Sequence, residues 1–259
     1  MPYGEDLDIQ RKTERIDDIG MGGFKVVQGD GFSYGIDAVL LAAFVSGETG
    51  AKPIKSRLKM RVADLGTGNG IIPFILAHKL PLSEIVGFEK NPVALDRAVR
   101  GRGMNALENR IRFVLTDISD ISQFDGYDDV FDAVVTNPPY FRRGSGIPNE
   151  DSAKFIARHE TTAGIAEFAK CGSRILKSGG DFYMIHRPSR LPDISEALRA
   201  AALEPKELQL VVPSSNEPAN LVLIHAVAGA KPDLKMLPEI AVYNSDGSGY
   251  TDLIKRIYL

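Results

Sequence analysis

The residues with the clearest chemical potential form one tetrapeptide, Asn137-Pro138-Pro139-Tyr140, which directly follows an apolar run. The Asn137 side-chain carbonyl and the Pro138 backbone carbonyl are two acceptors on a loop that the prolines stiffen. Such acceptors can bind both N–H bonds of a planar amine and take up positive charge as its nitrogen becomes tetrahedral. Tyr140 can stack on a flat substrate, which is worth on the order of 1–3 kcal/mol per base. The tetrapeptide therefore favours group transfer to a planar amine over the alternative, a turn that only ends a strand.

A second candidate site is the glycine-rich turn Gly66-Thr67-Gly68-Asn69-Gly70, which follows a β-branched run that contains Asp64. Such a turn lets backbone approach a ligand closely, and the helix that follows offers free N–H donors. A dinucleotide-binding turn would need its third glycine at the position of Ile71. The charge of Asp64 also suits a zwitterionic amino-acid group better than a pyrophosphate. We therefore expect Asp64, Gly66, Thr67, Gly68 and Gly70 to bind a cofactor that carries an amino-acid group.

Acidic residues also end the next two predicted strands. Glu89, followed by Lys90, can accept both hydroxyls of a ribose, although nicotinamide enzymes use the same geometry. Asp117 can accept a hydrogen bond from an adenine amine, and Ile118 can pack on the ring. Because open α/β sheets bind ligands at the carboxyl ends of their strands, we expect these residues to complete the cofactor site. The alternative is that Asp64, Glu89 and Asp117 are merely loop acids.

Alternating β-branched and amphipathic segments from Met60 onward predict repeated β-α units and a mainly parallel sheet. The expected strands are Arg61–Leu65, Ile85–Phe88, Ile111–Leu115, Phe131–Val135, Asp181–Ile185, Leu208–Val212 and Leu221–Val227. The expected helices are Ile71–Leu80, Pro92–Met104, Thr162–Leu176 and Pro192–Ala202. The third of these should end at the glycines after Lys177, since glycine adopts the left-handed cap. The loop between the last two strands can close an antiparallel pair at the sheet edge.

The flanking segments predict additions to this core. We expect residues 1–59 to form an extension with a strand at Phe24–Gln28 and a helix that opens at Asp37. Residues 60–230 should form the catalytic domain. Residues 231–259 mix prolines with a Ser-Asp-Gly-Ser-Gly turn, which predicts an ordered tail with little regular structure.

Composition limits the partners. The 259 residues hold 31 lysines and arginines against 34 acids, a net charge of −3, so any nucleic acid must bind a local patch. The single cysteine, Cys171, excludes an internal disulfide and a cysteine-based zinc site, and it is expected in the core. The longest apolar run, Val39–Val45, is too short to span a bilayer, and the acidic N-terminus is no signal peptide. These features predict a cytoplasmic protein without membrane or metal partners, and they leave its oligomeric state open.

Both motifs resemble those of class I S-adenosylmethionine-dependent methyltransferases. The G-x-G-x-G turn after Asp64 is similar to their first motif, and N-P-P-Y at Asn137–Tyr140 is similar to the fourth motif of the amino-methyltransferases. The resemblance implies a Rossmann-like seven-stranded α/β sheet, mostly parallel with an antiparallel last strand and with helices on both faces. It also implies S-adenosylmethionine as the cofactor.

The chain further resembles the family that methylates adenosine beside the anticodon of valine tRNA. The segment that looks like its cofactor-covering part is Gly31–Ala42, which would add Tyr34 and Asp37 to the cofactor contacts. The resemblance also implies that Asn137 contacts the cofactor in addition to the amine. Similar segments lie near Arg158-His159-Glu160, Met184–Leu191, Ala219–Ile224, Lys231–Lys235 and Val242–Asn244. The resemblance implies tRNA as partner and adenosine N6 as target. The alternatives are rRNA guanine N2 or a release-factor glutamine amide, which share N-P-P-Y, or a degenerate binding module, which would have broken motifs.

The RNA surface is the least specific part of the sequence. Phe141, Arg142 and Arg143 directly follow the catalytic loop, where phosphates of a flipped-out nucleotide would pass, so we expect them to contact substrate together with Tyr140. The other arginine clusters, at 97–102 and 187–190, are expected to be solvated faces. His186, which ends a predicted strand, is expected to be a packed or hydrogen-bonded residue.

Overall fold

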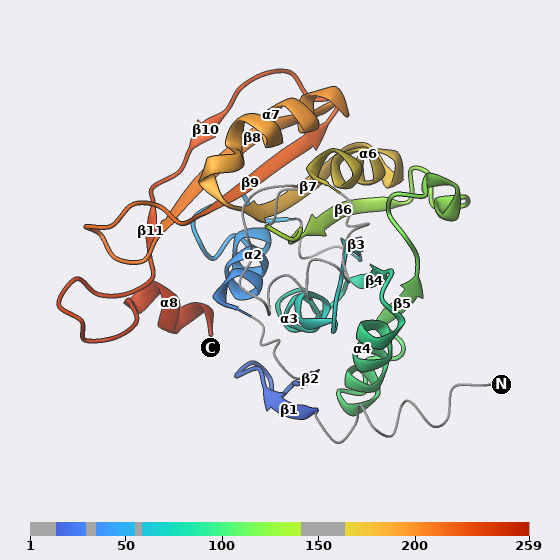
Figure 1. Cartoon of the computed structure of the whole chain (residues 1–259), viewed down its shortest axis with the longest axis horizontal. Helices are drawn as coiled ribbons and strands as arrows, with labels where there is room; N and C mark the ends of the chain where they lie inside the picture. Colours follow the sequence, from blue (N-terminus) through green and yellow to red (C-terminus); the bar gives the residue numbers. More distant parts are fainter. Residues whose placement is uncertain (1–13, 30–34, 55–58, 141–163, 259) are drawn as a thin grey trace, which may run out of the picture.

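The computed structural model describes residues 14–29, 35–54, 59–140 and 164–258 (Figure 1). Within these ranges the main sheet has nine strands in the order β10-β8-β9-β7-β6-β3-β4-β5, with β11 also pairing with β8. The strands are β3 (Arg61–Leu65), β4 (Glu84–Glu89), β5 (Ile111–Leu115), β6 (Phe131–Thr136), β7 (Leu176–His186), β8 (Leu203–Val212), β9 (Leu221–Ala228), β10 (Lys235–Met236) and β11 (Ile240–Ala241). Neighbours are parallel, except that β9 runs antiparallel to both β7 and β8. The predicted seven-stranded core with an antiparallel last strand is confirmed.

Helices cover both faces of this sheet, as expected (Figure 1). One face carries α2 (Ile36–Ser46), α3 (Ile71–Lys79) and α4 (Pro92–Met104), and the other carries α6 (Ile165–Ile175) and α7 (Leu191–Ala200). Each face buries its own apolar cluster. Cys171 is a residue of α6 and lies buried in the second cluster. Short 3₁₀ turns occur at Ile121–Phe124 and Pro188–Arg190. No helix among the described residues is long and apolar enough to cross a membrane.

The boundary between α6 and β7 differs from the prediction. The helix ends at Ile175, and the chain enters β7 at once, so the glycines after Lys177 lie inside the strand and not in a helix cap. Phe131 pairs with Leu176 whereas Ala133 pairs with Asp181, which leaves extra residues on β7. They form a bulge in which Gly179 has φ +72°, a conformation that glycine adopts readily. The glycines therefore serve sheet pairing.

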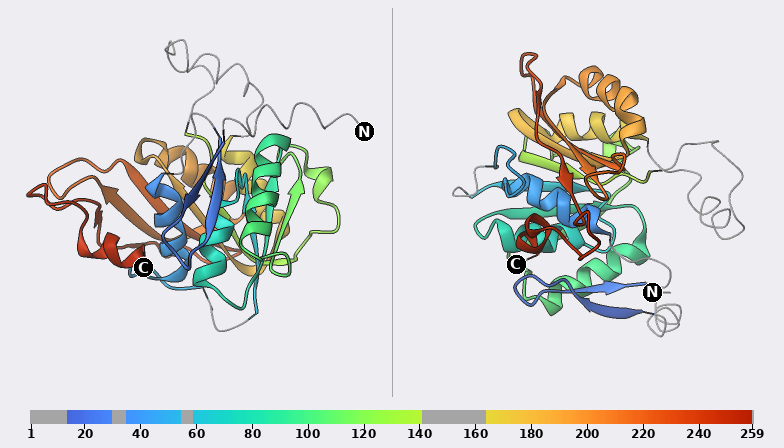
Figure 2. Two further views of the ribbon diagram at one scale, coloured as in Figure 1. Left: turned by 90° about the horizontal axis from the view of Figure 1, so that it is seen from below. Right: turned by 90° about the vertical axis from the view of Figure 1, so that its left-hand side faces the viewer.

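The two ends of the chain add structure to the core. The N-terminal hairpin of β1 (Arg15–Asp18) and β2 (Lys25–Gln28) packs on α4 (Figure 2). The strand near 24–28 was expected, but β1 was missed because its sequence, RIDD, is short and polar. The tail was expected to be ordered with little regular structure, and its regular elements are short. β10 and β11 extend the sheet beside β8, and α8 (Asp252–Ile257), capped by the Thr251 hydroxyl, packs on α2.

Candidate active site

The glycine turn and the N-P-P-Y loop leave neighbouring strands at the same edge of the sheet. In the β3–β6 register Leu65 lies opposite Thr136, so Gly66 and Asn137 are the next residues on the two strands. The buried Thr136 hydroxyl donates to the Leu65 carbonyl oxygen at 2.9 Å, which fixes this junction. The amine-binding and cofactor-binding segments predicted from the sequence are therefore adjacent.

The glycine turn is held on β4 and is open on one side. The backbone N–H groups of Gly66 and Thr67 both donate to the Phe88 carbonyl oxygen, at 2.9 and 3.0 Å. Gly68 has φ +58°, and no atom lies within 4 Å of the place that a Cβ would occupy. A ligand can therefore approach the backbone at Gly68 without meeting a side chain.

Gly70 is required by packing. It has φ +85°, and a Cβ would lie 2.8 Å from the Phe113 ring and 3.1 Å from the Phe74 ring. We expect Gly70→Ala to lower the free energy of unfolding by about 2–4 kcal/mol, from backbone strain plus overpacking, measured by urea denaturation. Gly126, with φ +86° and open space around it, is the matched control, and Gly126→Ala should cost only about 1 kcal/mol. Equal losses in the two variants would contradict a packing role for Gly70.

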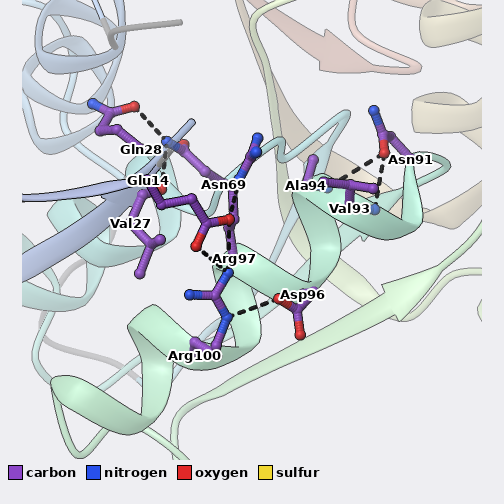
Figure 3. Close-up of polar contacts among 10 residues, drawn as sticks. All are labelled: Glu14, Val27, Gln28, Asn69, Asn91, Val93, Ala94, Asp96, Arg97 and Arg100. Carbon is purple, nitrogen blue, oxygen red and sulfur yellow. Dashed lines mark hydrogen bonds and ion pairs between the residues drawn. The ribbon is translucent and has the colours of Figure 1, made fainter. Parts of the chain in front are cut away.

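Glu89 connects the glycine turn to the start of α4. Its Oε2 accepts a hydrogen bond from the Gly68 N–H, and its Oε1 accepts one from the Asn91 N–H, both at 2.8 Å. Asn91 in turn caps α4 by accepting from the N–H of Val93 at 2.9 Å, as Figure 3 shows. Each carboxylate oxygen has a further lone pair, so Glu89 can hold the turn and still accept ligand hydroxyls.

Asp64 is fully buried under this turn. Among the described residues neither of its carboxylate oxygens has a hydrogen-bond partner, and neither has the buried Thr67 hydroxyl. Burial raises the pKa of Asp64 to about 7; the neighbouring Thr67 hydroxyl opposes this rise, and the charge of Glu89 adds to it. A buried carboxylate without a partner is costly, so the site fits a ligand that brings a cationic, hydrogen-bond-donating group.

The remaining predicted cofactor residues lie at the same edge. Glu89 is opposite Leu115 in the β4–β5 register, which places Asp117 just beyond the end of β5. The Asp117 Oδ1 accepts from the Ser119 N–H at 2.9 Å, and this contact fixes the turn. Ile118 is buried against the apolar cluster that contains Phe88. Lys90, partly exposed, follows β4.

Asn137, Tyr140 and Asp37 form a closed set of hydrogen bonds. The Asn137 Nδ2 donates to Asp37 Oδ2 at 2.9 Å. The Tyr140 hydroxyl lies 2.8 Å from both Asp37 Oδ2 and Asn137 Oδ1. Because a carboxylate only accepts, Asp37 fixes the amide so that its oxygen points away from the acid. Asp37 at the start of α2 therefore presents Asn137 Oδ1 as an acceptor, although 100 residues separate the two in sequence.

The ring of Tyr140 is also held. It makes an edge-to-face contact with His186, with centroids 5.1 Å apart, and the Arg187 guanidinium lies over it. Burial and the charge of Asp37 raise the pKa of Tyr140, so its hydroxyl stays protonated. Burial and the nearby Arg190 and Arg187 lower the pKa of His186 to about 4. His186 is thus neutral at pH 7, and its Nδ1 accepts from the Arg187 N–H at 2.8 Å.

Comparison with known proteins identifies the chain. Residues 50–199 match the family model of the methyltransferase small domain. This span includes both the glycine turn and the N-P-P-Y loop. The chain belongs to this methyltransferase family. The resemblance that the motifs indicated is thereby confirmed.

Individual relatives carry a more specific name. A tRNA1(Val) (adenine(37)-N6)-methyltransferase of Porphyromonas gingivalis is 32% identical over 62% of this chain and 60% of its own length. One of the same name from Bacteroides fragilis is 27% identical over 87% of this chain and 90% of its own length. The chain thus matches about 60% of the length of the first relatives.

Solved structures show the same fold. A predicted O-methyltransferase from Agrobacterium tumefaciens aligns with a TM-score of 0.67 at 23% identity, over 86% of this chain and 95% of that one. A 16S rRNA N2 methyltransferase of T. thermophilus, solved with AdoMet and guanosine, aligns with a TM-score of 0.56 at 20% identity, over 83% and 51% of the two chains. At these identities, the two structural similarities show only a shared fold.

Figure 3 shows contacts that sequence reasoning missed. The Asn69 Nδ2 of the glycine turn donates to Gln28 Oε1 at 2.8 Å, which attaches the N-terminal hairpin to the cofactor turn. On α4, which packs against this hairpin, Arg97 and Arg100 both form ion pairs with Glu14 at 2.8 Å. These arginines therefore fasten the N-terminal segment. No sequence signal indicates these contacts, because their residues are distant along the chain.

Several predicted residues lie outside the described part of the chain. They are Tyr34, Phe141, Arg142, Arg143 and the segment Arg158-His159-Glu160. His186 is hydrogen-bonded and packed, as expected. Asp37 was expected to bind cofactor, and the structure places its carboxylate on Asn137 and Tyr140.

Proposed function

We propose that the protein transfers a methyl group from S-adenosylmethionine to N6 of an adenosine next to the anticodon in tRNA. The observation that carries this proposal is the Asn137 amide, turned by Asp37 so that its oxygen is presented beside the turn that covers Asp64. The names of the relatives from P. gingivalis and B. fragilis support the choice of substrate. The reaction would occur in the cytoplasm, with residues 60–230 as the methyltransferase domain.

The residues around the glycine turn fit this cofactor. The unpaired oxygens of Asp64 suit the ammonium group of its amino-acid part, and the open side of Gly68 admits the ligand against backbone. Glu89 has lone pairs free for the ribose hydroxyls, while Asp117 and Ile118 remain the predicted contacts of the adenine. When bound, the cofactor supplies an electrophilic methyl group on a sulfonium.

The N-P-P-Y loop positions the amine. Asn137 Oδ1 and the Pro138 carbonyl oxygen accept the two N–H bonds, which directs the nitrogen lone pair along the third direction. As the nitrogen gains the methyl group it becomes positive, and these two oxygens stabilise that charge. The carboxylate of Asp37, bound behind the Asn137 amide, adds to the stabilisation. The extra proton then passes to water, so no side chain is needed as a strong base.

Tyr140 has a place in this cycle because its hydroxyl lies on the acceptor that the amine needs. In the free protein it is 2.8 Å from Asn137 Oδ1. A substrate amine that binds Asn137 takes over this position, and the Tyr140 hydroxyl can keep its contact with Asp37. The aromatic ring then offers its face to the base.

The proposed function is tested by incubating the protein with methyl-labelled S-adenosylmethionine and total RNA. We expect the label in N6-methyladenosine of tRNA, identified by mass spectrometry of nucleosides, and the loss of that nucleoside from tRNA of a strain that lacks the protein. Label in guanine N2 of rRNA, or on a protein with none in tRNA, would overturn the proposal. Asn137→Ala serves as the inactive control.

A further inference from the structure

Arg187 combines a fixed backbone with a side chain that is held weakly. It follows β7 directly, and its N–H is bound to the buried His186. Its exposed guanidinium lies over the Tyr140 ring, with Cζ 5.1 Å from the centroid. Its other described side-chain contact is a 3.4 Å hydrogen bond from Nη1 to the Asn220 carbonyl oxygen. An exposed cation over a ring is held by only a small free energy, so the side chain can leave while the backbone stays.

Among the described residues, the charge of Arg187 lacks an acidic partner, unlike that of its neighbours. Arg190, on the same turn, forms an ion pair with Asp193 at 2.5 Å. Arg199 on α7 lies 3.5 Å from Glu204. Across the described ranges, no carboxylate is within ion-pair distance of the Arg187 guanidinium. A guanidinium without a carboxylate beside an amine-binding loop is suited to bind a phosphate group.

The position of this guanidinium conflicts with methyl transfer. A base that stacks on Tyr140 competes with Arg187 for the ring. The reaction also makes the amine nitrogen positive, and a second cation on the adjacent ring would oppose that charge. Arg187 must therefore move when the base enters, and RNA brings the anion that can attract it.

We propose that Arg187 covers the Tyr140 ring in the free enzyme and moves to a backbone phosphate of the bound RNA, which opens the ring for the target base. The proposal rests on the proposed function, because it takes RNA as the substrate. It makes one side chain respond to the polynucleotide and control access for the base. A free nucleoside carries no phosphate, so it has to displace Arg187 without help, and the enzyme prefers RNA.

The test measures binding with S-adenosylhomocysteine present, so that no methyl transfer is needed. The dissociation constants of adenosine and of an adenosine-containing RNA stem-loop are determined at several salt concentrations. For Arg187→Ala we expect RNA binding about tenfold weaker, with a salt slope smaller by about 0.7–0.9, the value of one phosphate contact. Adenosine should bind about two- to fivefold more tightly, because the cover is gone.

Two further variants separate the charge from the cover. Arg187→Lys keeps the charge but not the planar group, so it should keep the salt slope of the wild type. Arg199→Ala removes another exposed arginine and should change neither ligand. Weaker binding of both ligands by Arg187→Ala with an unchanged salt slope would overturn the proposal and leave Arg187 as a support for Tyr140. Because the salt slope of RNA binding depends on the phosphate contact and not on the base, it decides on Arg187 even if the wild type methylates a different RNA base.

Discussion

Alanine in place of Asn137 is expected to lower kcat/KM for methyl transfer by about 10²–10³-fold, the cost of removing one preorganised acceptor that stabilises charge in the transition state. The Asn137 side chain is half-buried and forms hydrogen bonds with Asp37 and Tyr140. Its loss removes the oriented acceptor while the cofactor turn remains intact. The measurement is steady-state methyl transfer to tRNA, with the affinity for S-adenosylmethionine determined separately by calorimetry.

Asp37→Ala tells a positioning role from the cofactor role that the family resemblance implies. If Asp37 only fixes the Asn137 amide, its loss should lower kcat by about tenfold and leave the cofactor affinity within a factor of two. Asp37→Asn keeps an oxygen that can accept from Asn137 Nδ2, so it should recover part of the loss. A large drop in cofactor affinity with kcat retained would instead place Asp37 in the cofactor site. Asn137→Ala with full activity would remove the proposed mechanism.

The sequence was informative where local chemistry determines the structure. Asn91 followed by Pro92 predicts the start of α4, and the structure confirms it, because the asparagine accepts from free N–H groups and proline fits the first turn. β3 and β5 have the expected bounds, since β-branched runs between turns are strongly constrained. The strand-end position of Asp64 and Asn137 follows from the same runs. Their side-by-side placement then follows from parallel pairing.

Long-range contacts were out of reach of such reasoning. The glycines after Lys177 look like a helix cap, and only the pairing of β7 with β6 makes them a bulge. β10 and β11 are two residues each and exist because β8 offers unpaired backbone groups. The contact of Asp37 with Asn137 depends on how α2 packs against the sheet. Each of these features is decided by tertiary partners that no local pattern encodes.

The second large effect concerns Asp64 in the protein without cofactor. Its pKa is raised to about 7 in the folded state, against 3.8 for an aspartate in the unfolded chain. Between these values the folded state holds a proton that the unfolded state has lost, so stability falls as pH rises through this window. The difference between these two pKa values corresponds to a penalty on the order of 4 kcal/mol above pH 7. Below about pH 4 both states are protonated and the penalty disappears.

Asp64→Asn cannot ionise and should therefore escape this pH dependence. We expect its free energy of unfolding, relative to the wild type, to rise by about 3 kcal/mol between pH 5 and pH 8, measured by urea denaturation without cofactor. Comparing the two pH values cancels the cost of the amide itself. Asp233→Asn, which changes an exposed carboxylate in the tail, is the control and should show no such rise. A wild type and an Asp64→Asn variant with parallel pH profiles would refute the buried, ionisable state of Asp64.

S-adenosylmethionine should stabilise the wild type more than the Asp64→Asn variant. An ammonium group on Asp64 gives the ionised form the partner that it lacks among the described residues, so binding favours deprotonation and strengthens as pH rises to about 7. In Asp64→Asn this charge-assisted contact is missing, and the affinity should fall by about 10–100-fold. A cofactor concentration of 100 times the wild-type dissociation constant stabilises the wild type by about 2.7 kcal/mol and the variant by far less. At pH 8 the cofactor should therefore lower the stability of the variant relative to the wild type by about 1.3–2.3 kcal/mol, because the site stores in an unpaired carboxylate part of the free energy that binding releases.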